Sequence, residues 1–189
     1  MKIGIIGSGR VGYSMGKYMQ DHGIRVTGFY DRHRERALDA AQFTGTDSFD
    51  RIEDLVAASD TLFFTTSDGE IANVWDCIRH LSIQGKIICH FSGSLSSDQF
   101  QGIEKTRAYG LSIHPMLAFS DKYTSYKQLQ NAFFTLEGHA QALAVMEPLL
   151  QKMGNPVQRI APEQKALYHA AAATLQKRQP QQQLLIRQR

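Results

Sequence analysis

The stretch Lys2-Ile-Gly-Ile-Ile-Gly-Ser-Gly-Arg-Val-Gly12 decides the fold of this 189-residue chain. Its short apolar run predicts a buried strand, and the glycines follow at once. Gly7 permits a tight turn, Gly9 lets a pyrophosphate approach the backbone, and Gly12 lets the next helix pack closely on the strand. The helix N-terminus then offers free N–H groups and a positive dipole end to phosphates. The residues expected to bind a dinucleotide here are Gly7, Ser8, Gly9, Arg10, Val11 and Gly12.

The context of this motif makes it more specific than glycine spacing alone. A helical pattern follows over residues 10–22, a second strand over 24–30, and then Asp31, nineteen positions beyond Gly12. A glycine-rich turn in an unrelated α/β domain would explain the turn but not the position of this acid. The predicted cofactor is therefore NAD or NADP. Asp31 could bind the ribose hydroxyls of NAD, whereas Arg32 and Arg34 could hold the 2′-phosphate of NADP or simply begin a solvated helix. That choice stays open.

Composition excludes several other classes of protein. Hydrophobic residues make up 42% of the chain and charged residues 21%, as in a soluble globular protein, and no apolar run is long enough to span a membrane. Cys77 and Cys89 lack metal-ligand spacing and make no disulfide framework, so we expect no metal site and a cytoplasmic location. The net charge of +3 comes from the last sixteen residues, which hold four of the 21 basic residues and no acid. The other 17 basic residues face 18 acidic ones, so we expect no nucleic-acid partner.

Strand and helix patterns alternate along the rest of the chain. The further predicted strands span 61–65, 86–90, 108–113, 132–136 and 157–160. The further predicted helices span 32–43, 52–58, 71–81, 95–103 and 139–153. We expect loops at 45–50 and 117–130, and we expect Ala37, Leu38 and Ala41 to face the core. The pattern predicts an α/β fold with a Rossmann-type, doubly wound, mostly parallel sheet over residues 1–160.

Composition changes near the C-terminus. Ala161-Pro-Glu163 is typical of a helix start, and residues 161–175 are predicted to form the first helix of a helical domain. Six of the last sixteen residues are Gln, and Pro180 interrupts any helix. Residues 176–189 are therefore predicted to form a disordered tail.

Polar residues gather where the predicted parallel strands end, which is where open α/β sheets bind ligands. Thr66, Ser67 and Asp68 follow one strand and are candidates for cofactor binding, with helix capping as the alternative. His90 to Ser94 and His114-Pro115 follow the next two strands. A histidine at such a place is often a hydrogen-bonded structural residue. Spacing reveals no acid–base triad, which argues against Ser92 as a nucleophile.

Three stretches carry a resemblance to a known family. They are Gly4 to Gly12, then His90-Phe-Ser-Gly-Ser94 with Ser112-Ile-His-Pro-Met-Leu-Ala-Phe-Ser120, and finally Glu163-Gln-Lys-Ala-Leu-Tyr-His-Ala-Ala-Ala172. Over residues 1–173 the chain resembles Rossmann-like proteins that carry a C-terminal DUF2520 domain. These are related to 6-phosphogluconate and β-hydroxyacid dehydrogenases, ketopantoate reductase and pyrroline-5-carboxylate reductase, and His114-Pro115-Met116 also resembles prephenate dehydrogenases.

The resemblance implies catalytic candidates and a dimer. In these relatives a Lys, with a polar residue four positions later, opens the helical domain and faces substrate and nicotinamide. Lys165 and His169 match those positions, and the expected catalytic residues are Lys165, His169, His114 and Ser92. From the residues alone, Lys165 would be a surface lysine on an amphipathic helix. The helical domain of the relatives continues and builds a homodimer, whereas this sequence departs from the pattern at Thr174. A truncated or frame-shifted end would produce that departure, and it leaves the homodimer open.

Two functions compete at this point. The first is an NAD(P)-dependent oxidoreductase that transfers hydride to or from a small carbonyl, imine or hydroxy substrate, with Lys165 as acid or base and His90, Ser92 and His114 placing the substrate. The second is a dinucleotide-binding module without turnover, either a redox sensor or a remnant of a longer enzyme. A methyltransferase that uses S-adenosylmethionine is disfavoured, because residues 2–6 contain no acid.

Overall fold

An eight-stranded sheet runs through the computed structural model, which describes residues 1–170. The strands lie in the order β3-β2-β1-β4-β5-β6-β7-β8, and every neighbouring pair is parallel except β6 and β7. Their bounds are β1 Lys2–Ile6, β2 Arg25–Tyr30, β3 Asp47–Ser48, β4 Thr61–Phe64, β5 Ile87–His90, β6 Tyr109–Pro115, β7 Phe134–Gly138 and β8 Val157–Arg159. The order 3-2-1-4-5-6 is that of a Rossmann sheet, so the predicted fold class is confirmed.

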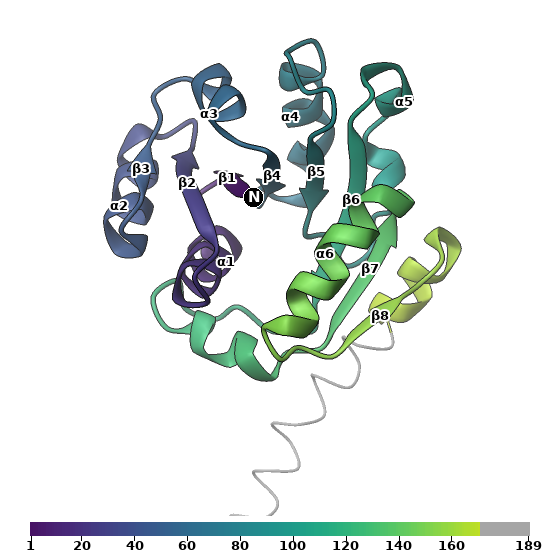
Figure 1. The fold of residues 1–189 in the computed structure, drawn as a ribbon. Helices are drawn as coiled ribbons and strands as arrows, with labels where there is room; N and C mark the ends of the chain where they lie inside the picture. Colours follow the sequence, from purple (N-terminus) through teal and green to yellow (C-terminus); the bar gives the residue numbers. More distant parts are fainter. Residues whose placement is uncertain (171–189) are drawn as a thin grey trace, which may run out of the picture.

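Helices cover both faces of this sheet (Figure 1). The α-helices are α1 Arg10–Asp21, α2 Arg34–Thr44, α3 Ile52–Ala58, α4 Ile71–Ile78, α5 Ile103–Thr106 and α6 Ala140–Lys152. Short 3-10 helices are η1 Asp68–Glu70, η2 Ser97–Gln99, η3 Ser125–Asn131 and η4 Pro162–Gln164. A helix then begins at Lys165 and continues to residue 170, the last one described. Most of the predicted segment 161–175 lies within these bounds, whereas the predicted tail 176–189 lies outside the described residues.

Two apolar clusters hold the layers together. One packs α1, α2 and α6 against one face of the sheet, and the other packs α3, α4 and α5 against the opposite face. Successive residues of β4 alternate between them, because side chains of a strand point to opposite faces: Phe63 joins the first cluster, and Leu62 and Phe64 join the second. Central strands buried on both faces explain the continuous apolar runs in the sequence.

Three local expectations were wrong. Residues 45–50 contain β3, because Gly28 lacks a side chain that would overlap the Asp47 carbonyl oxygen, which lets the two backbones pair. Residues 95–103 form η2 and an irregular link instead of one helix, since Gly102 adopts φ +76° and the Ser97 N–H bonds a distant carboxylate. The segment 117–130 is irregular only as far as η3.

The helix α2 also differs from expectation on its inner face. Ala37 and Ala41 are buried as predicted, but Leu38 is 44% exposed and Ala40 takes the inward position. Residues 37, 40, 41 and 44 form the stripe at helical spacing, and Leu38 lies off it. Small alanines allow α2 to lie close to its neighbours. Leu38 was predicted to be buried because it is apolar, but its position on the helix faces away from the core.

Among residues 1–170, no helix is long and apolar enough to cross a membrane. Over the same residues, no group of three or more His, Cys, Asp or Glu side chains is arranged to hold a metal ion.

Candidate functional site

The Gly-rich loop, residues 7–12, joins β1 to α1 at the carboxyl edge of the sheet and includes the start of that helix. Gly7 adopts φ +103°, a conformation that disfavours any side chain. A Cβ on Gly12 would overlap the Gly7 carbonyl oxygen and lie 2.7 Å from Thr65 Oγ1, so only glycine lets α1 start this close to β1 and β4. A Cβ on Gly9 would meet only the Thr65 carbonyl oxygen at 3.8 Å, so the space above this residue is open.

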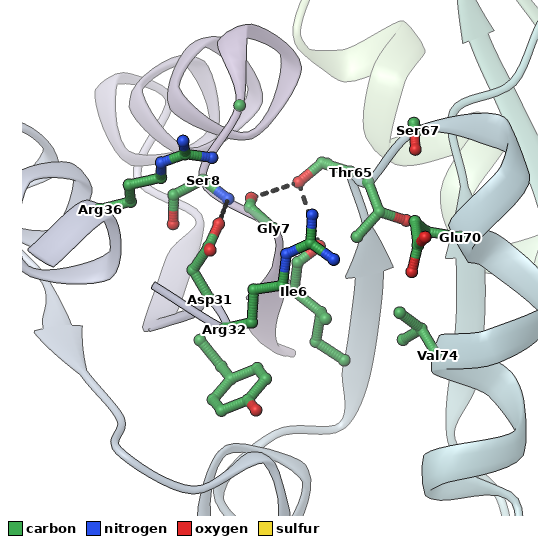
Figure 2. Close-up of a pocket in the computed structure, with 13 residues that line it drawn as sticks. Ile6, Gly7, Ser8, Asp31, Arg32, Arg36, Thr65, Ser67, Glu70 and Val74 are labelled. Atoms are coloured by element: carbon green, nitrogen blue, oxygen red, sulfur yellow. Dashed lines mark hydrogen bonds between the residues drawn. The ribbon is translucent and has the colours of Figure 1, made fainter. Parts of the chain in front are cut away.

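A pocket of about 270 Å³ lies over this loop and reaches the ends of β2 and β4 (Figure 2). Seven of the predicted cofactor residues line it: Gly7, Ser8, Gly9, Asp31, Arg32, Thr66 and Ser67. Four others do not line it: Arg10, Val11, Gly12 and Asp68. Six further residues line the pocket and were not predicted from the sequence: Ile6, Tyr30, Arg36, Thr65, Glu70 and Val74. Arg36 could have been found, because it lies four positions after Arg32, which is one turn of the helix predicted over residues 32–43.

Asp31 fixes the loop from the end of β2. Its carboxylate accepts the Ser8 N–H at 2.7 Å and the His33 N–H at 2.9 Å, and Figure 2 shows it pointing at the loop. Each carboxylate oxygen keeps a further acceptor position, so Asp31 can brace the loop and still accept a ribose hydroxyl.

Several features of the pocket fit a dinucleotide. The Ser8 and Thr66 hydroxyl oxygens are buried without a hydrogen-bond partner, which is unusual unless a ligand supplies one. No side chain caps the N-terminus of α1, and no acid lies in its first turn. Free N–H groups and the positive helix end therefore face the loop, as a pyrophosphate requires.

The arginines after β2 differ from the prediction in their positions. Arg34 pairs with Asp50 at 2.6 Å on the surface and does not line the pocket. Arg32 and Arg36 both line it, and both lie beside the Gly-rich loop in Figure 2. The pair that could hold a phosphate is thus 32 and 36 instead of 32 and 34.

Lys165 is buried beyond the ends of β5 and β6, with 1% of its surface exposed. Its ammonium group donates hydrogen bonds to the Ser92 carbonyl oxygen at 3.1 Å and to the Ser112 hydroxyl. Burial lowers the pKa of Lys165 to about 8, against the opposing pull of the Glu137 and Asp68 carboxylates. The surface-lysine alternative is therefore wrong: the first residue of the final helix points into the protein.

The Ser92 hydroxyl organises the loop after β5. It donates to Asp68 at 2.8 Å and accepts the N–H groups of Ser94 at 3.2 Å and Leu95 at 3.0 Å. The acceptor of this hydroxyl is thus a carboxylate, and the expectation that Ser92 is not a nucleophile stays a prediction. No side chain caps η1, so the Asp68 carboxylate serves this loop and not the helix-capping role considered from sequence.

Two other candidate histidines meet beside Gly93. The rings of His114 and His169 are 5.5 Å apart between centroids, and the Nδ1 atoms of both are buried without a partner. A Cβ on Gly93 would overlap His169 and lie 2.8 Å from His114 Nε2. Burial, with Lys165 and His169 nearby, lowers the pKa of His114 to about 4, so its ring is neutral at pH 7.

His90 has a structural role. Its Nδ1 accepts the Ser92 N–H at 3.3 Å, and its Nε2 lies 2.9 Å from the Ser96 carbonyl oxygen, which places the proton on Nε2. The ring is fully buried, and burial lowers the pKa of His90 to about 4. The structural alternative considered for histidines at strand ends thus fits His90, whereas His114 keeps an unpartnered nitrogen.

The fold is of the Rossmann type, and the pocket over its Gly-rich loop fits a dinucleotide. Residues 1–75 match the oxidoreductase family with an NAD-binding Rossmann fold. Residues 132–177 match the domain of unknown function DUF2520. These matches confirm the resemblance carried by the Gly-rich loop and the Lys165 helix. No curated protein sequence matches the chain significantly.

Solved structures share the fold. A candidate NADP oxidoreductase from Bacteroides fragilis has a TM-score of 0.82 at 19% identity, over 97% of this chain and 70% of that one. An imine reductase from a Pseudomonas species has a TM-score of 0.73 at 18% identity, over 92% of this chain and 61% of that one. A reductive aminase from Aspergillus terreus, in complex with NADPH and ethyl-5-oxohexanoate, has a TM-score of 0.69 at 18% identity, over 93% and 61%. The chain therefore spans about 60% of the length of the last two neighbours.

Proposed function

We propose that this protein is an NAD(P)-dependent oxidoreductase that transfers hydride to or from a small carbonyl, imine or hydroxy substrate. The observation that carries the proposal is the buried ammonium group of Lys165, held at the same sheet edge as the dinucleotide pocket. A bound nicotinamide would supply the hydride chemistry. The protein would bind the cofactor, exclude water and move one proton.

Lys165 is the proposed acid–base residue. A group with a pKa of about 8 is mostly protonated at pH 7 and still gives up its proton readily, which suits general acid catalysis. Two of its three donor positions are used by Ser92 and Ser112, and the third is proposed to face the substrate oxygen or nitrogen. The neutral ring of His114, with the side chains of His169 and Ser92, is proposed to place the substrate.

The finer choice of cofactor is proposed to favour NADP. Arg32 and Arg36 give the pocket two positive groups beside the place expected for the adenosine ribose, and guanidinium groups bind phosphate well. If so, Arg36→Ala weakens NADP binding by about 10- to 100-fold and leaves NAD binding nearly unchanged, because a hydrogen bond to a charged group is worth about 1.5–3 kcal/mol. Arg34→Ala is the matched control and should change neither affinity. Equal loss of both cofactors in Arg36→Ala would contradict the proposal.

Asp31 offers the converse test. Asp31→Ala should weaken NAD binding more than NADP binding, because the ribose diol loses its acceptor while the arginines remain. Both affinities also lose the bracing of the Ser8 N–H, so some loss is common to both. Equal losses would mean that Asp31 is structural only.

The proposed activity is tested by measuring NADPH and NADH oxidation against a panel of keto acids, aldehydes, ketones and cyclic imines. Oxidation that depends on one substrate class supports the proposal. Saturable cofactor binding with no oxidation of any substrate would refute it. That outcome would favour the second candidate, a binding module without turnover, which gains support from the bonds that already engage the Lys165 ammonium group.

A further inference from the structure

Glu137 is a buried carboxylate near the C-terminal end of β7, in a strand whose other residues are uncharged. It is 3% exposed. One oxygen accepts the Ser97 N–H at 2.7 Å and the other accepts the Ser97 hydroxyl at 2.7 Å. Within residues 1–170, no Lys or Arg lies within ion-pair distance of it. A buried charge without a compensating charge is strongly unfavourable, so this carboxylate needs an explanation.

Lys165 presents the same problem with the opposite sign. Its ammonium group is buried, and the two acceptors that it contacts, the Ser92 carbonyl and the Ser112 hydroxyl, are both neutral. No carboxylate of the described residues lies within ion-pair distance of it.

The sheet brings these two charges to one place. Ser112 and Glu137 are direct partners across the antiparallel pair β6 and β7, so their side chains leave the same face of the sheet as neighbours. The Ser112 hydroxyl is also the group that Lys165 contacts. One serine therefore adjoins both buried charges. The segment from Ser92 to Ser97 is a second connection between the two charges. Glu137 accepts hydrogen bonds from Ser97 at one end of this segment, and Lys165 donates to the Ser92 carbonyl oxygen at the other end.

We propose that Glu137 is a positioning residue for Lys165: its carboxylate is the buried counter-charge that keeps the ammonium group protonated, and its bonds to Ser97 fix the loop that presents the Ser92 carbonyl. That the proton then serves hydride transfer rests on the proposed function. The pairing of the two charges does not.

The other charged and titratable groups around Lys165 play smaller parts. Asp68 on η1 is a second carboxylate that favours the protonated lysine, and it ranks after Glu137. Among residues 1–170, the imidazoles of His90 on β5 and His114 on β6 also interact with the Lys165 charge, and His169 on the final helix packs against His114. The depressed pKa values of His90 and His114 keep both rings neutral at pH 7, so the two carboxylates supply the balancing charge.

The test is a lysine NMR titration of the folded full chain, with the Lys165 signal assigned by its loss in Lys165→Met. Glu137→Gln keeps the shape and can still bond Ser97, but it removes the charge. It should lower the pKa of Lys165 by about one unit or more, since a nearby opposite charge shifts a pKa by about 1–3 units. Ser97→Ala is the matched control: it removes one bond to Glu137, keeps the charge, and should leave the pKa nearly unchanged. An unchanged Lys165 pKa in Glu137→Gln would overturn the proposal.

A second measurement covers the case in which Glu137→Gln does not fold. The double variant E137Q/K165M removes both buried charges and should fold, with a higher urea midpoint than either single variant that folds. A double variant no more stable than the single variants would overturn the proposal. Neither readout needs a substrate, so a chain without turnover would refute the proposed function and leave this result standing. Where turnover is found, Glu137→Gln should move the alkaline limb of its pH profile to lower pH.

Discussion

The Gly-rich loop and the Lys165 site lie at the same edge of one sheet, yet they are built differently. The loop is made of neighbours in sequence and works mainly through its backbone: Gly12 packs against the Gly7 carbonyl, and the Ser8 N–H is held by Asp31. The Lys165 site works through side chains from five separate segments, namely Asp68, Ser92, Ser112, Glu137 and Lys165.

The two sites therefore depend on different physical properties. The loop depends on the absence of side chains, because a Cβ on Gly7 or Gly12 would lie too close to neighbouring backbone. The unpartnered hydroxyls of Ser8 and Thr66 and the uncapped N-terminus of α1 can bind a ligand. The Lys165 site needs balanced charge in a dry place, where removal of one partner leaves another unpaired. The loop should therefore respond to added atoms, and the Lys165 site should respond to charge and to pH.

The largest effect should come from adding one methyl group to the loop. Gly12→Ala forces an overlap with the backbone of Gly7, and we expect the free energy of unfolding to fall by about 3 kcal/mol or more, with loss of cofactor binding. Gly9→Ala meets nothing closer than 3.8 Å, so stability should stay within about 0.5 kcal/mol while cofactor binding weakens.

Gly69→Ala is the control for both variants, because a Cβ there has no neighbour within 4 Å. Urea denaturation and cofactor fluorescence titration measure the two quantities separately. Full cofactor affinity in Gly9→Ala would show that no ligand approaches this part of the loop.

The next effect concerns stability in acid and depends on His90, which lies near Lys165. The pKa of His90 in the folded chain is about 4, below the ordinary 6.5, so the unfolded chain binds a proton more readily as pH falls through this window. Stability is therefore lost on acidification, by about 2 kcal/mol for such a histidine between pH 7 and about pH 4.5.

The measurement is the free energy of unfolding in urea at both pH values, for the protein and for His90→Asn. The variant should be less stable at pH 7 but should lose less stability on acidification. An equally steep pH dependence in the variant would contradict the burial of a neutral imidazole at this position. His22→Asn, on the partly exposed end of α1, is a suitable control.

A smaller effect should separate the two sites from one another. Gly93→Ala places a methyl group where the His169 ring now lies, so the His169 side chain must move. We expect kcat/KM to fall by about 10- to 100-fold, since small displacements of positioning groups have this cost, while cofactor affinity stays within about twofold. A parallel loss of cofactor affinity would show that the two sites are not independent.

The same contrast explains what could be predicted from the sequence. The Gly-rich loop and Asp31 were predictable because their spacing is local and each residue type answers a local steric need. The sheet was predictable from alternating apolar and amphipathic segments. The burial of Lys165 could not be predicted from the residues around it in sequence, because a lysine on an amphipathic helix usually lies at the surface. Only the family resemblance indicated Lys165 as a catalytic candidate.

The missed features depend on contacts between distant segments. Glu137 bonds Ser97 from forty positions away and replaces the helix that local pattern predicted there. Arg34 and Arg36 differ in role because α2 turns one toward Asp50 and the other toward the pocket. Glu137 did carry one usable signal, since a single acid in an apolar strand is costly unless the fold gives it a partner.

The role of Lys165 as general acid is tested most directly by Lys165→Met, measured for turnover and for cofactor affinity in the same preparation. The substrate is whichever compound in the panel gives the fastest oxidation of NADPH or NADH. We expect kcat to fall by about 100-fold or more, as loss of a general acid requires, while the cofactor Kd changes by less than about twofold. Turnover that survives the substitution, with the cofactor still bound, would contradict it.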